Sequence, residues 1–220
     1  MAAVKLSCGK VIDTFQSFLR PSHPMSDEVI KIHGITNDMV KTAPSAQEVF
    51  TAFYQFINIE KEFLIAHHAP FDMGFIALEW ERLGLSLPKV PVFCSSLLSR
   101  RWITQSPNHR LQTLIKHLGL KPGAAHRALD DSKACLEIGL ECFKRSGLMT
   151  VAELLKSQTK NLLWENFMLG SLRSQPPLRE VILAIEQKVQ LEMVYEGGSR
   201  PGKMRTVSPM GLVRSPDGDF

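Results

Sequence analysis

Short apolar runs alternate with helix-forming segments over the first two thirds of the chain, and this alternation limits the folds open to it. Residues 62–66 form a brief apolar run typical of a buried strand, and Pro70 then opens a helical pattern that ends near Gly84. A second cycle follows, with one short strand and three helices at 92–94, 95–103, 110–118 and 127–146. Strands that alternate with helices predict an α/β domain built on a central sheet.

Two further strands are predicted before the first of these cycles. Residues 3–6 and 11–19 are strand-like on either side of a turn at Gly9. Pro21 and Pro24 end the second strand, because proline cannot continue a hydrogen-bonded ladder. Helices are predicted between this strand pair and the first cycle at 27–32 and 46–57.

The sequence changes character after Gly147. Residues 151–172 are predicted to be helical, and 174–177 form a linker with two prolines. One helix and two strands are then predicted at 178–188, 190–195 and 203–209. We therefore divide the chain into an α/β domain, a helical connector and the start of a small β-rich module, at 1–146, 147–177 and 178–220.

The composition excludes several classes of protein. With 44% hydrophobic and 22% charged residues in 220, the chain has the profile of a globular protein. No apolar run reaches the roughly 18 residues of a membrane span, and the first residues lack the apolar core of a signal peptide. The four cysteines form no Cys-x-x-Cys pair, which disfavours a disulfide scaffold or a zinc site. These features predict a cytoplasmic protein with reduced thiols and no membrane partner.

The first cluster of candidate functional residues spans 66–75, AHHAPFDMGF. Here a buried strand leads through two histidines and a proline into an acidic first helical turn. Asp72 is therefore expected at the carboxyl end of a strand, where open α/β sheets form their clefts. The alternative is that Asp72 only interacts favourably with the positive end of the helix dipole.

The second cluster spans 125–132, AHRALDDS. His126 lies at or just before the start of a helix, and Asp130 and Asp131 fall in its first turn. Capping and dipole stabilisation would explain both carboxylates without any function. The functional interpretation is an imidazole beside a metal-bound carboxylate, since histidine exchanges a proton near neutral pH and a hard cation prefers carboxylate oxygens.

Together, in this order, the clusters resemble the DEDDh class of 3′→5′ exonucleases, the family of the bacterial polymerase III proofreading subunit and of ribonuclease T. The resemblance covers about residues 3–145. Its five matching segments are FLRP at 18–21, IHGIT at 32–36, the A-H-x-x-x-F-D segment ending at Asp72, LQTLIKHLGL at 111–120, and H-x-A-x-x-D at His126, Ala128 and Asp131. His68 departs from the family's usual asparagine, although a histidine there can still donate a hydrogen bond.

The resemblance implies a ribonuclease H-like fold with a mixed central sheet and a two-metal hydrolysis of the terminal phosphodiester bond. Asp131 would bind the metal that carries the attacking water, Asp72 would help to hold the second metal, and His126 would be the general base. Magnesium or manganese fits such oxygen ligands. His33, in the IHGIT loop, would contact the terminal nucleotide.

The resemblance also implies partners: single-stranded or 3′-terminal nucleic acid, with DNA favoured over RNA, and a DNA polymerase. Seven basic residues cluster in sequence around the second motif and would suit non-specific attraction to phosphates: Arg100, Arg101, Arg110, Lys116, Lys121, Arg127 and Lys133. The alternative for these residues is an ordinary solvated surface. The formal net charge of +4 is compatible with either.

One family motif is missing from this sequence. The family carries Asp-x-Glu on its first strand, which supplies two of its four carboxylates, and no such motif precedes residues 3–6. Asp13 is no substitute, because Phe15 stands where the glutamate should be and the FLRP segment follows too closely. We therefore expect an N-terminally truncated exonuclease domain with poor activity as it stands. The alternative is a catalytically inactive nucleic-acid-binding or sensing protein that keeps the fold.

Residues 178–213 resemble the start of a WYL domain, a small β-rich ligand- or nucleic-acid-sensing module. The resemblance rests on a helix at 178–187, a strand ending at Tyr195, and the pattern R-x-V-x-P-x-G-L from Arg205 to Leu212. The alternative is a generic helix–hairpin appendage. A dinucleotide-binding oxidoreductase is excluded, because no Gly-x-Gly-x-x-Gly follows an early strand.

Overall fold

The computed structural model describes residues 1–57, 59–121, 127–194, 196 and 201–212. The chain divides into two compact units, Met1–Phe167 and Met168–Phe220, which are treated separately below. These units reflect packing within the chain, so the domain boundaries expected near residues 146 and 177 stay predictions.

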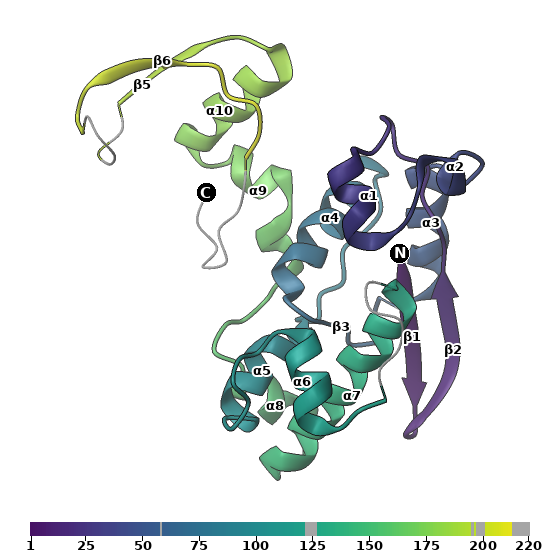
Figure 1. The fold of residues 1–220 in the computed structure, drawn as a ribbon. Coiled ribbons are helices and arrows are strands. Elements are labelled where there is room, and N and C mark those ends of the chain that lie inside the picture. Colours follow the sequence, from purple (N-terminus) through teal and green to yellow (C-terminus); the bar gives the residue numbers. More distant parts are fainter. Residues whose placement is uncertain (58, 122–126, 195, 197–200, 213–220) are drawn as a thin grey trace. The chain divides into compact units, whose positions relative to one another are not determined.

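The first unit has the α/β architecture that the sequence predicts (Figure 1). Its described elements are β1 (Ala2–Ser7), β2 (Lys10–Gln16), α1 (Asp27–His33), α2 (Asn37–Val40), α3 (Ala46–Phe56), β3 (Ile65–Ala66), α4 (Ala69–Arg82), β4 (Phe93–Cys94), α5 (Ser95–Trp102), α6 (Leu111–Leu118), α7 (Ala128–Ser146), α8 (Val151–Ser157) and the 3₁₀ helix η1 (Trp164–Phe167).

The strands of the described residues form separate pairs rather than one continuous sheet. β1 and β2 make an antiparallel hairpin, and β3 and β4 make a parallel pair of two residues each. The long helix α7 contacts both β1 and β3 (Figure 1). The α/β class is thus confirmed, while the single central sheet is not assembled because no described strand joins β1 to β3.

The hairpin leaves one edge of β1 without a partner strand. Met1 and Ser17 exchange both of their backbone hydrogen bonds. Because such pairs alternate along an antiparallel hairpin, the backbone N–H and C=O of Ala3 also point toward β2, while those of Ala2 and Val4 point to the opposite edge. At that edge the hydroxyl of Ser132 on α7 donates to the backbone oxygen of Ala2 (3.2 Å), and no described strand pairs with it. Ala2 and Val4 are half-buried, so this edge is only partly covered by the rest of the unit.

Two hydrophobic clusters hold the unit together. One surrounds the fully buried Trp80 and Met73 of α4 and takes in Phe53 of α3 and Trp164 of η1. The other lies between α5, α6, α7 and α8 and includes the fully buried Leu98 and Ile138. α4 and α7, which carry the two candidate carboxylates, are therefore each anchored in a core.

Several elements differ from the expectations. The short helix α2 is additional, and Thr36 caps it by accepting from the backbone N–H of Met39. The segment 151–172 is not one helix: α8 begins at a capping box of Thr150 and Glu153 and ends where Gln158 turns extended. The Gln158 side chain then binds the backbone of β4, accepting from Cys94 N–H (2.7 Å) and donating to Val92. Local helix propensity cannot predict this contact, because it depends on residues more than 60 positions away in the sequence.

The second unit contains α9 (Leu169–Arg173), α10 (Pro176–Gln187), β5 (Leu191–Val194) and β6 (Met204–Val207). α10 begins within the expected linker, because proline is well tolerated in a first helical turn. β5 and β6 follow α10 and pair with each other in antiparallel orientation. The order helix–strand–strand is as predicted, and the WYL resemblance stays a prediction. Within the described residues of the chain, no helix is long and apolar enough to cross a membrane.

Candidate functional site

The start of α4 places Asp72 at the carboxyl end of β3, as the sequence predicts. His68, the residue before the helix, has a left-handed backbone (φ 59°), which turns the chain sharply from the strand into the helix. Pro70 follows in the first turn, where its missing N–H costs nothing. Asp72 is the acidic residue of that turn.

The environment of Asp72 disfavours its negative charge. Asp72 is exposed as a whole residue, but protein atoms around its carboxyl group displace enough water to raise the pKa of that group to about 6, against an opposing hydrogen bond from its own backbone N–H. Among the described residues no Lys or Arg forms an ion pair with Asp72. A partly desolvated carboxylate without a cationic partner is a suitable ligand for a divalent cation.

Asp131 lies in the first turn of α7, which begins after Arg127. Its backbone N–H donates to Arg127 (3.0 Å), and the residue is half-buried. Cys135, one turn further along α7, lies on the same helix face as Asp131. The Asp72 charge is one of the influences that raise the pKa of the Cys135 thiol, so Asp72 lies within electrostatic reach of this face.

The remaining predicted site residues are less informative. His126 falls outside the described residues, so its role as general base stays a prediction. His33 is the last residue of α1, and its Nδ1 accepts from the backbone N–H of Ile35 (2.9 Å). This local bond shapes the IHGIT turn, and the expected nucleotide contact stays a prediction. Within the described ranges no group of three or more His, Cys, Asp or Glu side chains could hold a metal ion.

A polar network that the sequence did not predict lies at the turn between β3 and α4. His67, which precedes α4, joins its Nδ1 to the Ser95 hydroxyl (2.9 Å) and its Nε2 to the backbone oxygen of His109 (3.0 Å). Ser95 in turn contacts the Cys135 sulfur (3.3 Å). Cys135 is buried, and nothing in its local sequence indicates that its thiol is hydrogen-bonded.

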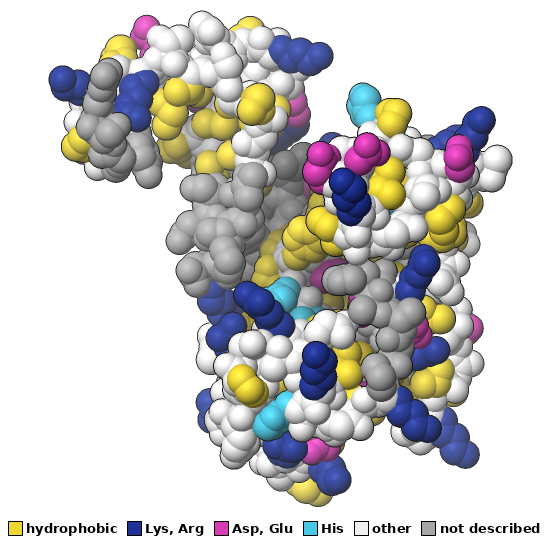
Figure 2. Space-filling model, in the orientation of Figure 1, with side chains coloured by type: hydrophobic (Ala, Val, Ile, Leu, Met, Phe, Trp, Pro, Cys, Tyr) yellow, Lys and Arg dark blue, Asp and Glu magenta, His cyan; other side chains and the backbone are white. Residues whose placement is uncertain are grey.

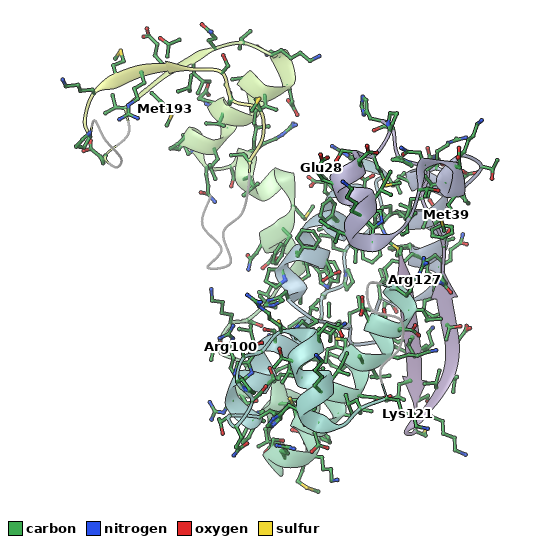
Figure 3. The ribbon with its side chains drawn as sticks, in the orientation of Figure 1. Glu28, Met39, Arg100, Lys121, Arg127 and Met193 are labelled. Carbon is green, nitrogen blue, oxygen red and sulfur yellow. The ribbon has the colours of Figure 1, made fainter. Side chains whose placement is uncertain are left out.

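The basic residues that cluster in sequence do not form one strip in space. Arg100 lies on α5, Lys116 on α6 and Lys133 on α7. Figure 2 shows Lys and Arg side chains spread over the visible face, and Figure 3 shows Arg100, Lys121 and Arg127 well apart in the first unit. Arg100 lies near the His67 network, because its positive charge is one of the influences that lower the pKa values of His68 and His109, after desolvation.

Comparison with known proteins identifies the class to which this fold and site belong. The family model RNase_T, described as exonuclease, matches residues 1–138, which is more than half of the chain. The chain therefore belongs to the exonuclease family, an enzyme class of 3′→5′ phosphodiester hydrolases that generally use divalent metal ions.

The curated relatives are DNA polymerases III of the PolC type. The protein of Bacillus cereus is 40% identical over 134 residues, which are 61% of this chain and 9% of that protein. The protein of Halalkalibacterium halodurans is 33% identical over 188 residues, 86% of this chain and 13% of that protein. The chain thus spans about a tenth of the length of these relatives.

Solved structures agree on the fold. Exonuclease X in complex with 5′ overhanging duplex DNA superimposes with a TM-score of 0.55 at 26% identity, over 71% of this chain and 88% of that one. A 3′-exonuclease that recognises a histone mRNA stem-loop superimposes with a TM-score of 0.53 at 22% identity, over 63% and 66% of the two chains, and shows the fold alone. These likenesses confirm the ribonuclease H-like α/β exonuclease fold.

Proposed function

We propose that this chain carries the catalytic domain of a metal-dependent 3′→5′ exonuclease that removes terminal nucleotides, from DNA in preference to RNA. The observation that carries the proposal is the Asp72 carboxylate, which follows β3, has lost part of its hydration and has no described cationic partner. Family membership supplies the reaction class, and exonuclease X supports DNA as substrate because its structure contains a DNA duplex.

Asp72 and Asp131 would hold the divalent ions, Mg²⁺ or Mn²⁺, since carboxylate oxygens are the preferred ligands of both. When bound, two such ions stabilise the attacking and the leaving oxygen of the scissile phosphate. His126 would accept the proton of the attacking water, which a neutral imidazole can do near pH 7. His33 would contact the terminal nucleotide.

The 220-residue chain, assayed alone, should be a weak nuclease. β1 (Ala2–Ser7) contains neither aspartate nor glutamate, and two carboxylates are too few to neutralise two divalent ions that face a phosphate. We propose that full activity requires an additional strand carrying Asp-x-Glu, for which the unpaired edge of β1 provides a place to bind. The rival is an inactive nucleic-acid-binding protein with the same fold.

Single-stranded DNA labelled at its 5′ end tests the proposal, because 3′→5′ digestion then produces a ladder of shortened labelled products. The 220-residue chain should give slow, Mn²⁺-dependent shortening, and a version extended by a strand with Asp-x-Glu should be faster by at least 100-fold. Asp72→Asn and Asp131→Asn should abolish the activity of the extended version. Asp130→Asn, which removes a charge from the same turn as Asp131, should leave most of it.

The outcomes distinguish an exonuclease from an inactive nucleic-acid-binding protein. Vigorous digestion by the 220-residue chain would contradict the expected impairment. DNA binding without hydrolysis, even after the extension, would favour the inactive binding protein. A short reading of the genomic sequence before the Met1 codon is a cheaper first test, since an in-frame Asp-x-Glu strand favours the enzyme.

We further propose that the chain acts beside a DNA polymerase, as the PolC-type relatives suggest by name. The WYL-like start of the second unit would be a separate sensing or binding module. Two alignments, of 188 and 203 residues, cover 86% and 91% of this chain and therefore extend into the second unit, so relatives of part of this unit exist within polymerase chains as well.

A further inference from the structure

His67, Ser95 and Cys135 form a largely buried series of hydrogen bonds that joins three parts of the first unit. Ser95 is fully buried and Cys135 is 5% exposed. Cys135 Sγ is hydrogen-bonded to Ser95 Oγ (3.3 Å), and Ser95 Oγ to His67 Nδ1 (2.9 Å). The other ring nitrogen, His67 Nε2, is hydrogen-bonded to the His109 backbone oxygen (3.0 Å). The partners lie 28 and 40 residues apart in the sequence, so the chain of bonds joins separate elements.

The direction of each bond follows from the chemistry of its ends. A backbone oxygen only accepts, so His67 Nε2 must carry a proton and donate to His109. Burial lowers the pKa of His67 to about 4, so the ring is neutral at pH 7 and Nδ1 is an acceptor. The Ser95 hydroxyl therefore donates to Nδ1, which leaves its oxygen to accept from the Cys135 thiol, whose pKa burial raises to about 12. Every donor in the chain has one acceptor.

The three residues belong to the elements that present the candidate carboxylates. His67 lies between β3 and α4 and precedes Asp72 by five residues, while Cys135 lies one turn beyond Asp131 on α7. Ser95 is the first residue of α5 and joins the two. α7 also packs closely against β3, because a Cβ atom on Gly139 would lie 2.4 Å from Cδ1 of Ile65. The bonded chain thus fixes the rotation of α7 relative to the start of α4.

We infer that His67, Ser95 and Cys135 are positioning residues, which hold Asp72 and Asp131 at the separation that divalent-cation binding requires. The inference rests on the proposed function, because it concerns the same carboxylates. It adds residues that touch neither metal nor substrate. Partners that orient metal ligands from outside the coordination shell typically change affinity by about 10- to 100-fold when removed, and the lower end applies to this indirect contact.

The first test concerns the direction of the three hydrogen bonds, and it uses histidine ¹⁵N NMR on the full 220-residue protein. His67 should be the neutral tautomer with its proton on Nε2, and Ser95→Ala should shift its Nδ1 signal by removing the donor. A His67 proton on Nδ1 in the unsubstituted protein would overturn the inference at its first step. This measurement involves no metal and no nucleic acid.

Positioning is tested with Mn²⁺ as the probe, by the paramagnetic broadening of the Asp72 and Asp131 carboxyl signals during a titration. Ser95→Ala and Cys135→Ala should each weaken Mn²⁺ binding about 10-fold. Cys135→Ser, which keeps a donor, should restore most of the affinity. The first-turn amide signals of α4 and α7 should shift in the Ala variants without metal.

Matched controls separate positioning from loss of stability. Cys142 lies on the same helix, is fully buried and forms no hydrogen bond with any residue that the structure describes, so Cys142→Ala removes an equal thiol from outside the bonded series. Ser157→Ala is the control for Ser95, since Ser157 is also buried and its hydroxyl bonds Trp102 and Leu154 rather than any member of the bonded series. Both controls should keep the Mn²⁺ affinity even if the unfolding temperature falls.

The outcomes for the inference and for the proposed function differ. Equal Mn²⁺ affinity and unchanged α4 and α7 amide signals in Ser95→Ala would overturn the positioning role. If Mn²⁺ broadens neither aspartate, either in the unsubstituted 220-residue protein or in the version extended by Asp-x-Glu, the proposed metal site is wrong. Positioning is then decided by the amide signals alone, and unchanged signals in Ser95→Ala reject it.

Discussion

The carboxyl group of Asp72 loses hydration when the chain folds, and this makes the free energy of unfolding depend on pH. Its pKa rises from 3.8 to about 6 on folding, mainly by desolvation. The folded state therefore binds more protons than the unfolded state between these values, and the free energy of unfolding falls as pH rises from about 4 to about 6.

Asp72→Asn should remove this pH dependence. In the absence of divalent ions the variant should be more stable than the original at pH 7 by on the order of 1 kcal/mol, since partial exposure screens much of the effect, and equally stable below pH 4. Urea unfolding at both pH values measures the difference. Asp130→Asn is the control and should lose stability, because it removes a favourable charge from the start of α7. A lower stability of Asp72→Asn at pH 7 would contradict the desolvation argument.

At the residue scale, the sequence identifies charged ligands better than the neutral residues that hold them. Asp72 and Asp131 are predictable because each begins a helix after an apolar or motif-bearing segment. Ser95 and Cys135 are not, because a small polar side chain in a helix has the same local pattern whether or not it meets a partner 40 residues away. His67 was visible as part of a motif, but its two partners come from tertiary packing alone.

At the scale of elements, the packing of α7 on β3 depends on the absence of one side chain. Gly139 has no Cβ, and an added one would lie 2.4 Å from the tip of Ile65, whereas Gly74 in α4 has open space. Glycine costs a helix about 1 kcal/mol relative to alanine. Gly74→Ala should therefore raise the free energy of unfolding by about 0.5–1 kcal/mol.

Gly139→Ala should lower the free energy of unfolding instead, by about 1–2 kcal/mol, because overpacking outweighs the gain in helix propensity. Urea denaturation of the pair gives the comparison. An equal gain in both variants would show that Ile65 moves aside without cost.

The unpaired edge of β1 gives a second prediction for an element. Its free backbone groups, such as those of Val4, can pair with a strand of another molecule, and edges of this kind promote association. Val4→Pro removes an N–H that points away from β2, so it should block such pairing and leave the hairpin intact.

Sedimentation velocity over a range of concentrations should show less self-association for Val4→Pro than for the original chain. Thr14→Pro is the matched control, since Thr14 faces Val4 across the hairpin and its N–H points to the outer edge. If only Thr14→Pro reduces association, the outer edge of β2 is responsible.

Most helices and both hairpins were predictable, since amphipathic spacing and turn residues act locally. The two-residue strands β3 and β4 were predicted too long, because an apolar run shows burial but not how many residues find a partner strand. The helix expected over 151–172 is broken for a similar reason: the Gln158 side chain binds the backbone of β4, which local sequence does not encode.

At the scale of the whole molecule, the first unit contains its own cores. Both hydrophobic clusters draw their buried residues from Met1–Phe167. A protein ending at Phe167 should therefore unfold cooperatively by itself, within a few degrees of the corresponding transition in the full chain. Calorimetry of both proteins measures this, and a shortened protein without a transition would show that the second unit is required for folding.

The bond between the Ser132 hydroxyl and the backbone oxygen of Ala2 spans 130 residues of sequence. At a synthesis rate of about 5–20 residues per second, the hairpin of β1 and β2 leaves the ribosome roughly 6 to 26 s before the helix that covers it. During translation the part of the hairpin that contacts α7 is therefore uncovered for that time, although Phe15 can already pack on Phe53 and Phe56 of α3. Slower elongation before residue 132 would lengthen that wait, so the yield of folded protein in a cell should respond to codon choice in this stretch.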